Sequence, residues 1–344
     1  KDIPEGAIQP DKPKEEIRDT PYNMPAGFEW SDVDVTIPEQ KDEVYELLAA
    51  NYVEDDDCQF RFDYSRDFLE WALTPPGTRK EFLLGVRSSS KGKLVAFISA
   101  IPAKVQVREN LVDMVEINFL CVHKKLRSKR LAPVLIKEIT RRVNLTGVFQ
   151  AVYTAGVVLP VPVGSARYFH RSLNPKKLVN VGFSRLPPRL TMARMQKLYK
   201  LPATTSTPNL RAMTGDDVEG VHTLLTTYLK KFPLHVAFTP EEVAHWLLPR
   251  PGVIDSFVVT NGEGTITDMC SYYHLPSSIL GFNDTLYAAY SFYNVATSVD
   301  LTELMRDSLI MAKNGGSDVF NALNLMENER FLEELKFGKG DGNL

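Results

Sequence analysis

The chain has 344 residues, about twice the length of a typical domain, so two domains or one duplicated domain are expected. Its 40 basic residues nearly balance its 43 acidic residues, which argues against a dedicated nucleic-acid-binding protein, because such proteins usually carry a strongly basic domain. Hydrophobic residues make up 44% of the chain and charged residues 24%, which excludes disorder over most of its length.

The cysteine content and the hydropathy exclude further classes of protein. Cys58, Cys121 and Cys270 are odd in number and widely spaced, so neither a disulfide framework nor a structural zinc site is indicated. No apolar run approaches the ~20 residues of a membrane span, and the first residues lack the hydrophobic region of a secretory signal. We expect a cytoplasmic protein that binds no metal and has no transmembrane segment.

The elements expected in the first hundred residues are an arm, two helices and a hairpin. Proline and charge dominate residues 1–30, which are expected to be extended rather than packed. Apolar residues at helical spacing predict helices at 43–52 and 68–73. Two apolar runs, 82–86 and 94–101, are separated by a Ser/Gly/Lys turn and predict a β-hairpin.

The next stretch predicts a β-loop-α-β unit. The run 115–122 is typical of a buried strand, and a basic loop, 123–130, follows it. Apolar residues three and four apart predict a helix at 131–143, and Pro133 fits its first turn, where a missing N–H does no harm. A second strand is expected at 149–156, with parallel pairing and a right-handed crossover.

A similar unit returns later in the chain. Its expected elements are a strand at 290–295, a helix at 301–312 and a strand at 319–326. Phe119 and Val122 align with Phe292 and Val295 at one constant spacing, which indicates an internal duplication. Chance similarity between two β-α-β units is the alternative. Either way, the fold class is α/β (α+β).

Two halves of the chain are therefore expected as domains. The N-terminal half would cover residues 1–200 and the C-terminal half residues 201–344. The Pro- and Thr-containing stretch 196–210 is the expected junction between them.

The basic loop after the first strand is a candidate phosphate site. Residues 127–132 lie where a strand leads into a helix N-terminus, and free N–H groups and the helix dipole favour an anion there. Acyl-CoA-using acetyltransferases carry an R/Q-x-x-G-x-G/A loop at this position. Arg127 and Ala132 fit that pattern, whereas Arg130 replaces its middle glycine. A solvated basic turn or a localisation-like KKLRSKR string is the alternative.

An acidic and aromatic segment, residues 54–64, is a second candidate site. Its carboxylates would attract Lys or Arg of an extended peptide, and the rings of Phe60, Phe62 and Tyr64 would line the pocket. A charged loop over a core aromatic strand is the alternative.

Histidine and cysteine residues indicate no nucleophilic triad. His170 and His274 each stand beside aromatic residues, where a structural hydrogen-bonding role is the more common one. Cys121 lies inside an apolar strand and is expected to be inert. Direct acyl transfer without a covalent enzyme intermediate is the better chemical interpretation.

Several motifs resemble those of one eukaryotic family. They are EINFLCVH at 116–123, FRFDYS at 60–65, RYFHRSLNPKKL at 167–178, AAYSFYNV at 288–295 and KFGKGDGNL at 336–344. The chain closely resembles the eukaryotic glycylpeptide N-tetradecanoyltransferases, or N-myristoyltransferases, nearly from end to end. The resemblance implies a duplicated GNAT-like fold, in which two pseudo-twofold-related halves surround a continuous mixed sheet.

The family's activity is transfer of a tetradecanoyl group from myristoyl-CoA, a substrate rather than a cofactor, to an N-terminal glycine amine. The resemblance implies that the amides of Phe119 and Leu120 form the oxyanion hole, with Asn118 and Thr154 near the amine. Acyl-CoA would contact Phe119, Leu120, Cys121, Val122, Arg127, Ser128, Lys129, Arg130, Leu131 and Ala132 in the first half. Peptide would contact Tyr52, Val53, Asp55, Phe60, Phe62, Tyr64, Gly156, Tyr168, His170, Ser277 and Asp341, with the second half contributing to the groove.

The sequence departs from the family pattern in two substitutions and at both ends. Lys339 stands where an apolar residue is usual, and Asn324 stands where Asp is usual. An upstream aromatic segment that helps to hold CoA and a tail beyond Leu344 are expected to be missing. In the family, the carboxylate at the end of that tail accepts the amine proton. A carboxylate at Leu344 is the alternative base.

The resemblance and the charge pattern together indicate the partners. Asp341 and residues 55–57 favour protein substrates with basic residues beyond the glycine. We expect myristoyl-CoA as the second substrate, no nucleic-acid partner and a monomer. A non-catalytic binder of acyl-CoA or glycine peptides is the alternative function.

Overall fold

The computed structural model describes residues 5–53, 59–157 and 159–344, and the chain forms two compact units. The first unit combines Lys1–Tyr52, Phe68–Tyr153 and Pro233–Ala237. The second unit combines Val53–Asp67, Thr154–Phe232 and Phe238–Leu344. The units are therefore interleaved in sequence, because each receives a short segment from the other half of the chain.

The first unit is built on a six-stranded mixed sheet with the order β1-β3-β4-β5-β6, in which β9 also pairs with β4. Its strands are β1 (Phe28–Asp32), β3 (Leu83–Ser88), β4 (Leu94–Val107), β5 (Asn110–Val122), β6 (Gln150–Val152) and β9 (Leu234–Val236). The pairing of β5 with β6 is parallel and the other pairings are antiparallel. The hairpin and the parallel pairing expected from the sequence are both confirmed.

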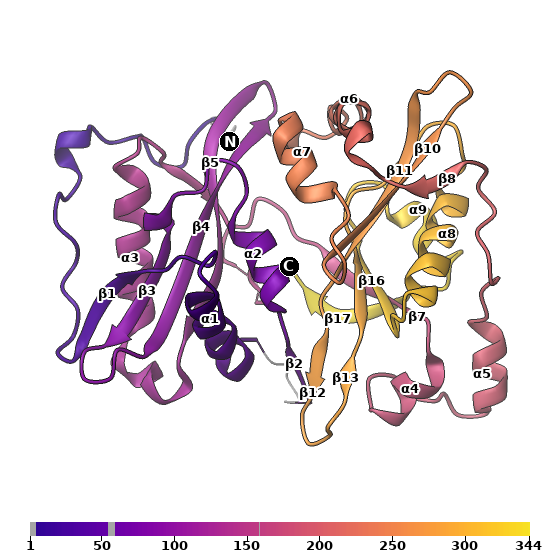
Figure 1. The fold of residues 1–344 in the computed structure, drawn as a ribbon, viewed down its shortest axis with the longest axis horizontal. Coiled ribbons are helices and arrows are strands. Elements are labelled where there is room, and N and C mark those ends of the chain that lie inside the picture. Colours follow the sequence, from indigo (N-terminus) through magenta and orange to yellow (C-terminus); the bar gives the residue numbers. More distant parts are fainter. Residues whose placement is uncertain (1–4, 54–58, 158) are drawn as a thin grey trace. The chain divides into compact units, whose positions relative to one another are not determined.

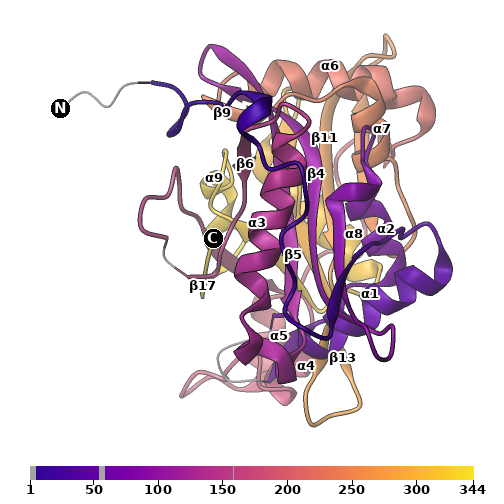
Figure 2. The same ribbon diagram turned by 90° about the vertical axis from the view of Figure 1, so that its left-hand side faces the viewer.

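Helices cover this sheet. They are η1 (Lys14–Glu16), α1 (Pro38–Asn51), α2 (Arg66–Leu73), η2 (Lys80–Phe82), η3 (Lys124–Lys129) and α3 (Leu131–Asn144). Figure 2 shows α3 and the α1–α2 pair on opposite sides of β4 and β5. The apolar spacing of α3 places Leu131, Leu135 and Ile139 in one buried cluster with residues of β3, β4 and β5. The N-terminus of α3 is thereby fixed beside the end of β5.

The N-terminal arm is more ordered than the sequence indicates, because its last residues form β1 at the sheet edge. The fully buried carboxylate of Glu138 on α3 binds the backbone of the arm before β1. Glu138 accepts hydrogen bonds from the Tyr22 amide (3.0 Å), Arg141 (2.6 Å) and Arg142 (3.0 Å). Buried charges of this kind persist only when they are paired.

The second unit contains an eight-stranded mixed sheet of order β17-β7-β16-β14-β11-β10-β8, with β15 also on β11, and a small sheet of order β13-β12-β2. The larger sheet comprises β7 (Arg167–Ser172), β8 (Leu210–Ala212), β10 (Ile254–Thr260), β11 (Ile266–His274), β14 (Ala288–Ser291), β15 (Val295–Ala296), β16 (Val319–Leu323) and β17 (Gly338–Asn343). The smaller comprises β2 (Phe60–Phe62), β12 (Ser277–Ile279) and β13 (Thr285–Leu286).

The helices of this unit are α4 (Pro175–Asn180), α5 (Met192–Leu198), η4 (Gly215–Asp217), α6 (Val218–Leu229), α7 (Pro240–Leu247), α8 (Leu301–Asn314) and α9 (Glu329–Leu332). The apolar face of α8 places Leu304, Met305 and Leu309 in the main buried cluster with Phe320 of β16. Within the described residues, no helix of either unit has the length and apolar character needed to cross a membrane.

The two units repeat one order of elements (Figure 1). The first runs β1, α1, α2, β3, β4, β5, α3, β6, and the second runs β8, α6, α7, β10, β11, β14, α8, β16. In each unit the strands before and after the last helix pair in parallel, and that helix has 14 residues. This agreement supports the duplication indicated by the sparse sequence repeat.

Two details differ from the sequence-based expectations. The strands of the described residues form three sheets rather than one continuous sheet, so that detail is wrong, although each large sheet is mixed. The strand expected at 290–295 is broken into β14 and β15, and the strand expected at 149–156 is only three residues long as β6. A run of hydrophobic residues in the sequence does not indicate at which residue the strand stops pairing with its neighbour.

Candidate functional site

A β-bulge interrupts the pairing of β5 with β4. Phe97 pairs with Cys121 and Ser99 pairs with Asn118, so Ile98 alone faces both Phe119 and Leu120. Phe119 has a φ of +57°, in the left-handed region that non-glycine residues rarely adopt. The bulge turns the backbone N–H groups at this point out of the regular ladder. Main-chain donors released from a ladder can stabilise a developing oxyanion.

Polar groups surround the bulge within the first unit. The Asn118 side-chain oxygen accepts a hydrogen bond from the Phe119 amide (2.8 Å) and one from the Tyr52 hydroxyl (3.4 Å). Ser99 donates a hydrogen bond to the Asn118 carbonyl (2.9 Å) and so holds the residue before the bulge. The Tyr52 ring lies 5.9 Å from the Phe119 ring, and burial raises the pKa of the Tyr52 hydroxyl to about 12. Tyr52 is therefore a neutral hydrogen-bonding group here.

The basic loop forms η3, a six-residue 3₁₀-helix directly before α3. Arg130 joins the two helices with φ +55° and ψ +40°, again in the left-handed region. Glycine adopts this conformation without steric cost, which explains why the acetyltransferase pattern has a glycine where this chain has Arg130. Neither η3 nor the first turn of α3 contains an acidic residue, and Lys125, Arg127 and Lys129 are exposed. The junction therefore favours an anionic ligand.

A buried asparagine anchors this loop. Asn51, the last residue of α1, accepts a hydrogen bond from the Lys124 amide (2.9 Å), and its carbonyl accepts one from Arg127 (2.9 Å). The Asn51 amide donates in turn to Leu47 (2.9 Å). The position of the loop thus depends on the end of a helix more than 70 residues away in sequence.

Cys121 is buried, as the sequence indicates. Burial raises the pKa of its thiol to about 12, against the opposing effect of Arg127. The thiolate, which is the nucleophilic form, is therefore scarce at neutral pH. This agrees with a reaction that forms no covalent intermediate.

An aromatic wall in the second unit contains several of the residues expected at the peptide site. Phe60, Phe62, Tyr64 and Tyr168 all pack against one buried cluster that includes Tyr290. Ser277 of β12 pairs in register with Phe62 of β2, so the small sheet brings them together.

His170 of β7 lies at the edge of this wall. Its Nδ1 hydrogen-bonds to the Asn321 side-chain oxygen (2.6 Å), and its ring lies 6.4 Å from that of Tyr168 in a stacked arrangement. Burial lowers the pKa of His170 below its ordinary value, although the Asn321 hydrogen bond and the Asp341 charge oppose the shift. At neutral pH a neutral imidazole therefore donates through Nδ1 and leaves Nε2 as an acceptor.

The sequence Gly340-Asp341-Gly342 presents a carboxylate beside His170. Opposite these three residues of β17 stands a single residue of β7, Tyr168, so the pairing contains a bulge of three residues against one. A Cβ on Gly340 would lie 2.3 Å from Nε2 of His170 and 2.9 Å from the Tyr168 carbonyl oxygen, so only glycine fits. Asp341 is exposed, which suits recognition of a cationic group.

For the other expected peptide-site residues the structure shows only their exposure, or does not describe them. Thr154 and Gly156 are exposed in the segment after β6, and Val53 is exposed. Asp55 and the acidic stretch 55–57 lie outside the described residues. The structure also adds Asn51 and Ser99, which the sequence analysis missed because their partners are distant in sequence.

Comparison with known proteins identifies the family of the chain. The family model described as myristoyl-CoA:protein N-myristoyltransferase, N-terminal domain, matches residues 7–166, and the corresponding C-terminal domain matches residues 180–344. The chain belongs to the N-myristoyltransferase family. The resemblance stated from the sequence motifs is therefore confirmed.

Relatives and solved structures support the same assignment. The chain is 55% identical to glycylpeptide N-tetradecanoyltransferase 1 of Arabidopsis thaliana, over 99% of this chain and 80% of that protein. It is 58% identical to glycylpeptide N-tetradecanoyltransferase 2 of Bos taurus, over 98% and 68%. A crystal structure of Saccharomyces cerevisiae N-myristoyltransferase with bound myristoyl-CoA is similar, with a TM-score of 0.95, 45% identity and coverage of 100% and 87%. The expected GNAT-like fold class and acyltransferase family are confirmed.

Proposed function

We propose that this chain transfers a tetradecanoyl group from myristoyl-CoA to the N-terminal glycine amine of proteins. The bulge at Phe119 carries the proposal, because it presents main-chain donors at the end of a strand that leads into an anion site. In the reaction the amine nitrogen bonds to the thioester carbonyl carbon and the C–S bond breaks. Coenzyme A leaves as a thiolate that takes up a proton, and the attacking amine loses one.

The first unit would bind the acyl-CoA. In the free protein the side chain of Asn118 satisfies the Phe119 amide, and a thioester oxygen would replace it as the acceptor. The amides of Phe119 and Leu120 then stabilise the negative charge on that oxygen. The η3 loop and the N-terminus of α3, from Arg127 to Ala132, hold the phosphates of CoA. Cys121 and Val122 contribute buried surface to the same segment.

The second unit would bind most of the peptide. The aromatic wall of Phe60, Phe62, Tyr64 and Tyr168 accommodates the chain next to the glycine. Asp341 favours Lys or Arg beyond the glycine by charge. Val53, Gly156, His170 and Ser277 belong to the same proposed surface, and Tyr52 of the first unit would also contact the peptide. Asn118 and Thr154 would lie near the amine.

Acyl transfer is tested by incubating the protein with tetradecanoyl-CoA and a peptide of sequence Gly-x-x-x-Ser-Lys. We expect one free thiol for each peptide that gains a tetradecanoyl group in mass spectrometry. The same peptide with an acetylated N-terminus is the control and should stay unmodified. Binding of tetradecanoyl-CoA in calorimetry without any acylated peptide would instead support the non-catalytic alternative.

The role of Thr154 is tested separately from folding. Thr154→Val keeps the shape of the side chain and removes its hydroxyl. Because Thr154 is exposed, we expect unchanged thermal unfolding. Loss of one hydrogen bond to the amine should lower kcat by about tenfold. Unchanged kcat and KM would remove Thr154 from the site.

Monomeric state and cytoplasmic location complete the proposal. A monomer should sediment with the chain mass of 38.7 kDa at every concentration tested. A fluorescently tagged protein should distribute through the cytoplasm of a eukaryotic cell. A mass that rises with concentration, or a signal confined to one organelle, would contradict these two statements.

A further inference from the structure

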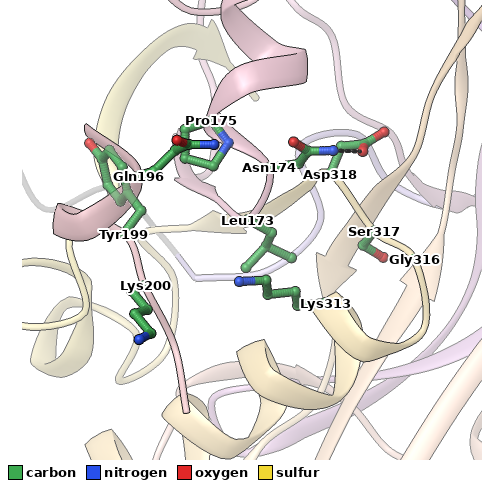
Figure 3. Close-up of a pocket in the computed structure, with 10 residues that line it drawn as sticks. All are labelled: Leu173, Asn174, Pro175, Gln196, Tyr199, Lys200, Lys313, Gly316, Ser317 and Asp318. Atoms are coloured by element: carbon green, nitrogen blue, oxygen red, sulfur yellow. Dashed lines mark hydrogen bonds between the residues drawn. The ribbon is translucent and has the colours of Figure 1, made fainter. Parts of the chain in front are cut away.

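A cavity of about 340 Å³ lies in the second unit, and none of its lining residues is among those proposed for transfer (Figure 3). Its lining comes from the end of β7, the start of α4, the residues after α5 and the end of α8. Leu173, Pro175 and Tyr199 supply its apolar surface, and Lys200, Lys313 and Asp318 supply charges. Its volume lies at the small end of the range of ligand pockets.

The single carboxylate of the lining is already neutralised. Asp318 accepts hydrogen bonds from Lys177 (2.8 Å), the Asn174 side chain (3.1 Å) and the Tyr287 amide (3.0 Å). The side chains of this pair are largely buried, with 21% of Lys177 and 6% of Asp318 exposed. Asp318 is therefore not available to offset other charges in the cavity.

Two lysines remain without a counter-charge. Lys200 and Lys313 are exposed, and no carboxylate of the described residues lies within ion-pair distance of either. Figure 3 shows the Lys313 side chain extended past Leu173 into the space that the lining residues enclose. Lys313 also lies in the last turn of α8, where a cation interacts favourably with the helix dipole.

A buried guanidinium adds to this positive charge. Arg171 is 3% exposed and, within the described part of the chain, forms no ion pair. It donates to the carbonyl of the lining residue Tyr199 (3.0 Å) and lies 5.1 Å from the centre of the Tyr199 ring. Burial lowers the pKa of Arg171 to about 10, with Arg306 acting in the same direction, so the group is still a cation at neutral pH.

We propose that this cavity binds a small phosphate-bearing molecule. Two ammonium groups supply point charges, which suit a tetrahedral dianion that can accept hydrogen bonds in many directions. The Gln196 amide at the rim offers a further donor. Leu173, Pro175 and Tyr199 would contact the uncharged body of the ligand.

The site is tested by calorimetry with inorganic phosphate and with glucose 6-phosphate, in protein saturated with tetradecanoyl-CoA. Saturation blocks the phosphate site at η3, so any remaining heat reports the second site. We expect glucose 6-phosphate to bind more tightly than phosphate, because its sugar ring reaches the apolar surface. Equal binding of citrate at the same concentration would overturn phosphate recognition, and no heat with either phosphate probe would overturn the site.

Variants locate the binding. Lys313→Gln and Lys200→Gln should each weaken glucose 6-phosphate binding by about tenfold, the value of one charge-assisted hydrogen bond. Lys197→Gln is the matched control, because Lys197 is an exposed lysine of α5 outside the cavity lining. If all three variants bound glucose 6-phosphate with the wild-type affinity, the ligand would bind elsewhere.

Chemical labelling gives a second readout that does not depend on folding of a variant. Amine acetylation of Lys200 and Lys313 should slow when glucose 6-phosphate is added, as followed by peptide mass spectrometry. Labelling of Lys197 in the same sample should not change. Equal slowing at all three lysines, or at none, would contradict a bound ligand in the cavity.

Discussion

In the first unit, β5 leads through η3 into α3, and in the second unit, β14 and β15 lead through residues 297–300 into α8. The two junctions occupy the same place in the repeated topology. Both expose backbone N–H groups at a helix N-terminus, where an anion is favourable. They differ in the source of that anion.

In the second junction the anion is a side chain of the same unit. Asp268 of β11 is fully buried, and its Oδ1 accepts the amides of Thr297 (2.7 Å), Ser298 (3.0 Å) and Val299 (3.2 Å). Its Oδ2 accepts the hydroxyls of Thr267 (2.7 Å) and Ser298. A carboxylate of the same unit thus binds the loop amides directly before α8.

The bulges before the two junctions differ in the same way. Between β14 and β15, the three residues Phe292 to Asn294 face only two residues of β11. Ser271 binds both the amide (2.9 Å) and the carbonyl (2.7 Å) of Tyr293, and the Asn294 side chain accepts the Ser271 amide (3.2 Å). The second bulge is closed by hydrogen bonds of Ser271 and Asn294, whereas at the first bulge the Asn118 side chain accepts the Phe119 amide beside a basic loop. One architecture therefore gives a structural site in one unit and a candidate catalytic site in the other.

The largest expected effect is that of Asp268→Ala. Removing this carboxylate leaves three amides and two hydroxyls without the acceptor they have in the wild type, which should lower the free energy of unfolding by about 2–3 kcal/mol. Urea denaturation measures the change. The matched variant in the first junction, Lys129→Ala, should leave stability within about 0.5 kcal/mol and weaken tetradecanoyl-CoA binding instead. Similar stability losses in both variants would mean that the junctions do not differ.

The pH dependence of stability should depend on the same residue. Burial opposes ionisation of Asp268, but the hydrogen bonds from Ser298, Thr267 and the loop amides outweigh it and hold the pKa below its ordinary value. A lowered pKa contributes stability above the unfolded-state pKa of about 3.9, and this contribution is lost as pH falls through the folded-state pKa. Denaturation midpoints should therefore fall more steeply below pH 4 in the wild type than in Asp268→Asn. Parallel pH profiles would contradict this assignment.

The two serines opposite the bulges give a matched pair with a smaller effect. Ser271→Ala should cost about 1–2 kcal/mol of stability, because it leaves the Tyr293 amide unpaired, and should leave kcat unchanged. Ser99→Ala releases the Asn118 carbonyl and loosens the bulge that is proposed to bind the oxyanion. We expect it to lower kcat by about tenfold, with a stability loss near 1 kcal/mol. Urea denaturation measures the loss of stability and the thiol-release assay measures kcat. A loss of kcat in Ser271→Ala but not in Ser99→Ala would contradict the proposed difference between the bulges.

The sequence predicts the elements of both junctions but not what distinguishes them. Apolar periodicity identifies α3 and α8 and the strands before them, because each helix must bury one face. The bulge at Phe119 leaves no such signal, since a positive φ at phenylalanine depends on the surrounding fold. Asp268 and Asn51 satisfy groups about 30 and 70 residues away, so only the folded chain shows their roles. The family motifs named the site residues without giving this physical reason.

The smallest expected effect comes from the residues directly before the two helices. Arg130 has a left-handed conformation and no side-chain cap, whereas Asp300 is extended and caps the Glu303 amide (3.1 Å). Arg130→Gly should raise the free energy of unfolding by about 0.5–1 kcal/mol, because glycine adopts a positive φ without steric cost. Asp300→Gly should lower it by a few tenths of a kcal/mol and Asp300→Ala by about 1 kcal/mol, because the capping oxygen is lost. Thermal unfolding of the three variants measures the signs, and a loss of stability in Arg130→Gly would show that the arginine side chain, rather than the backbone, determines this junction.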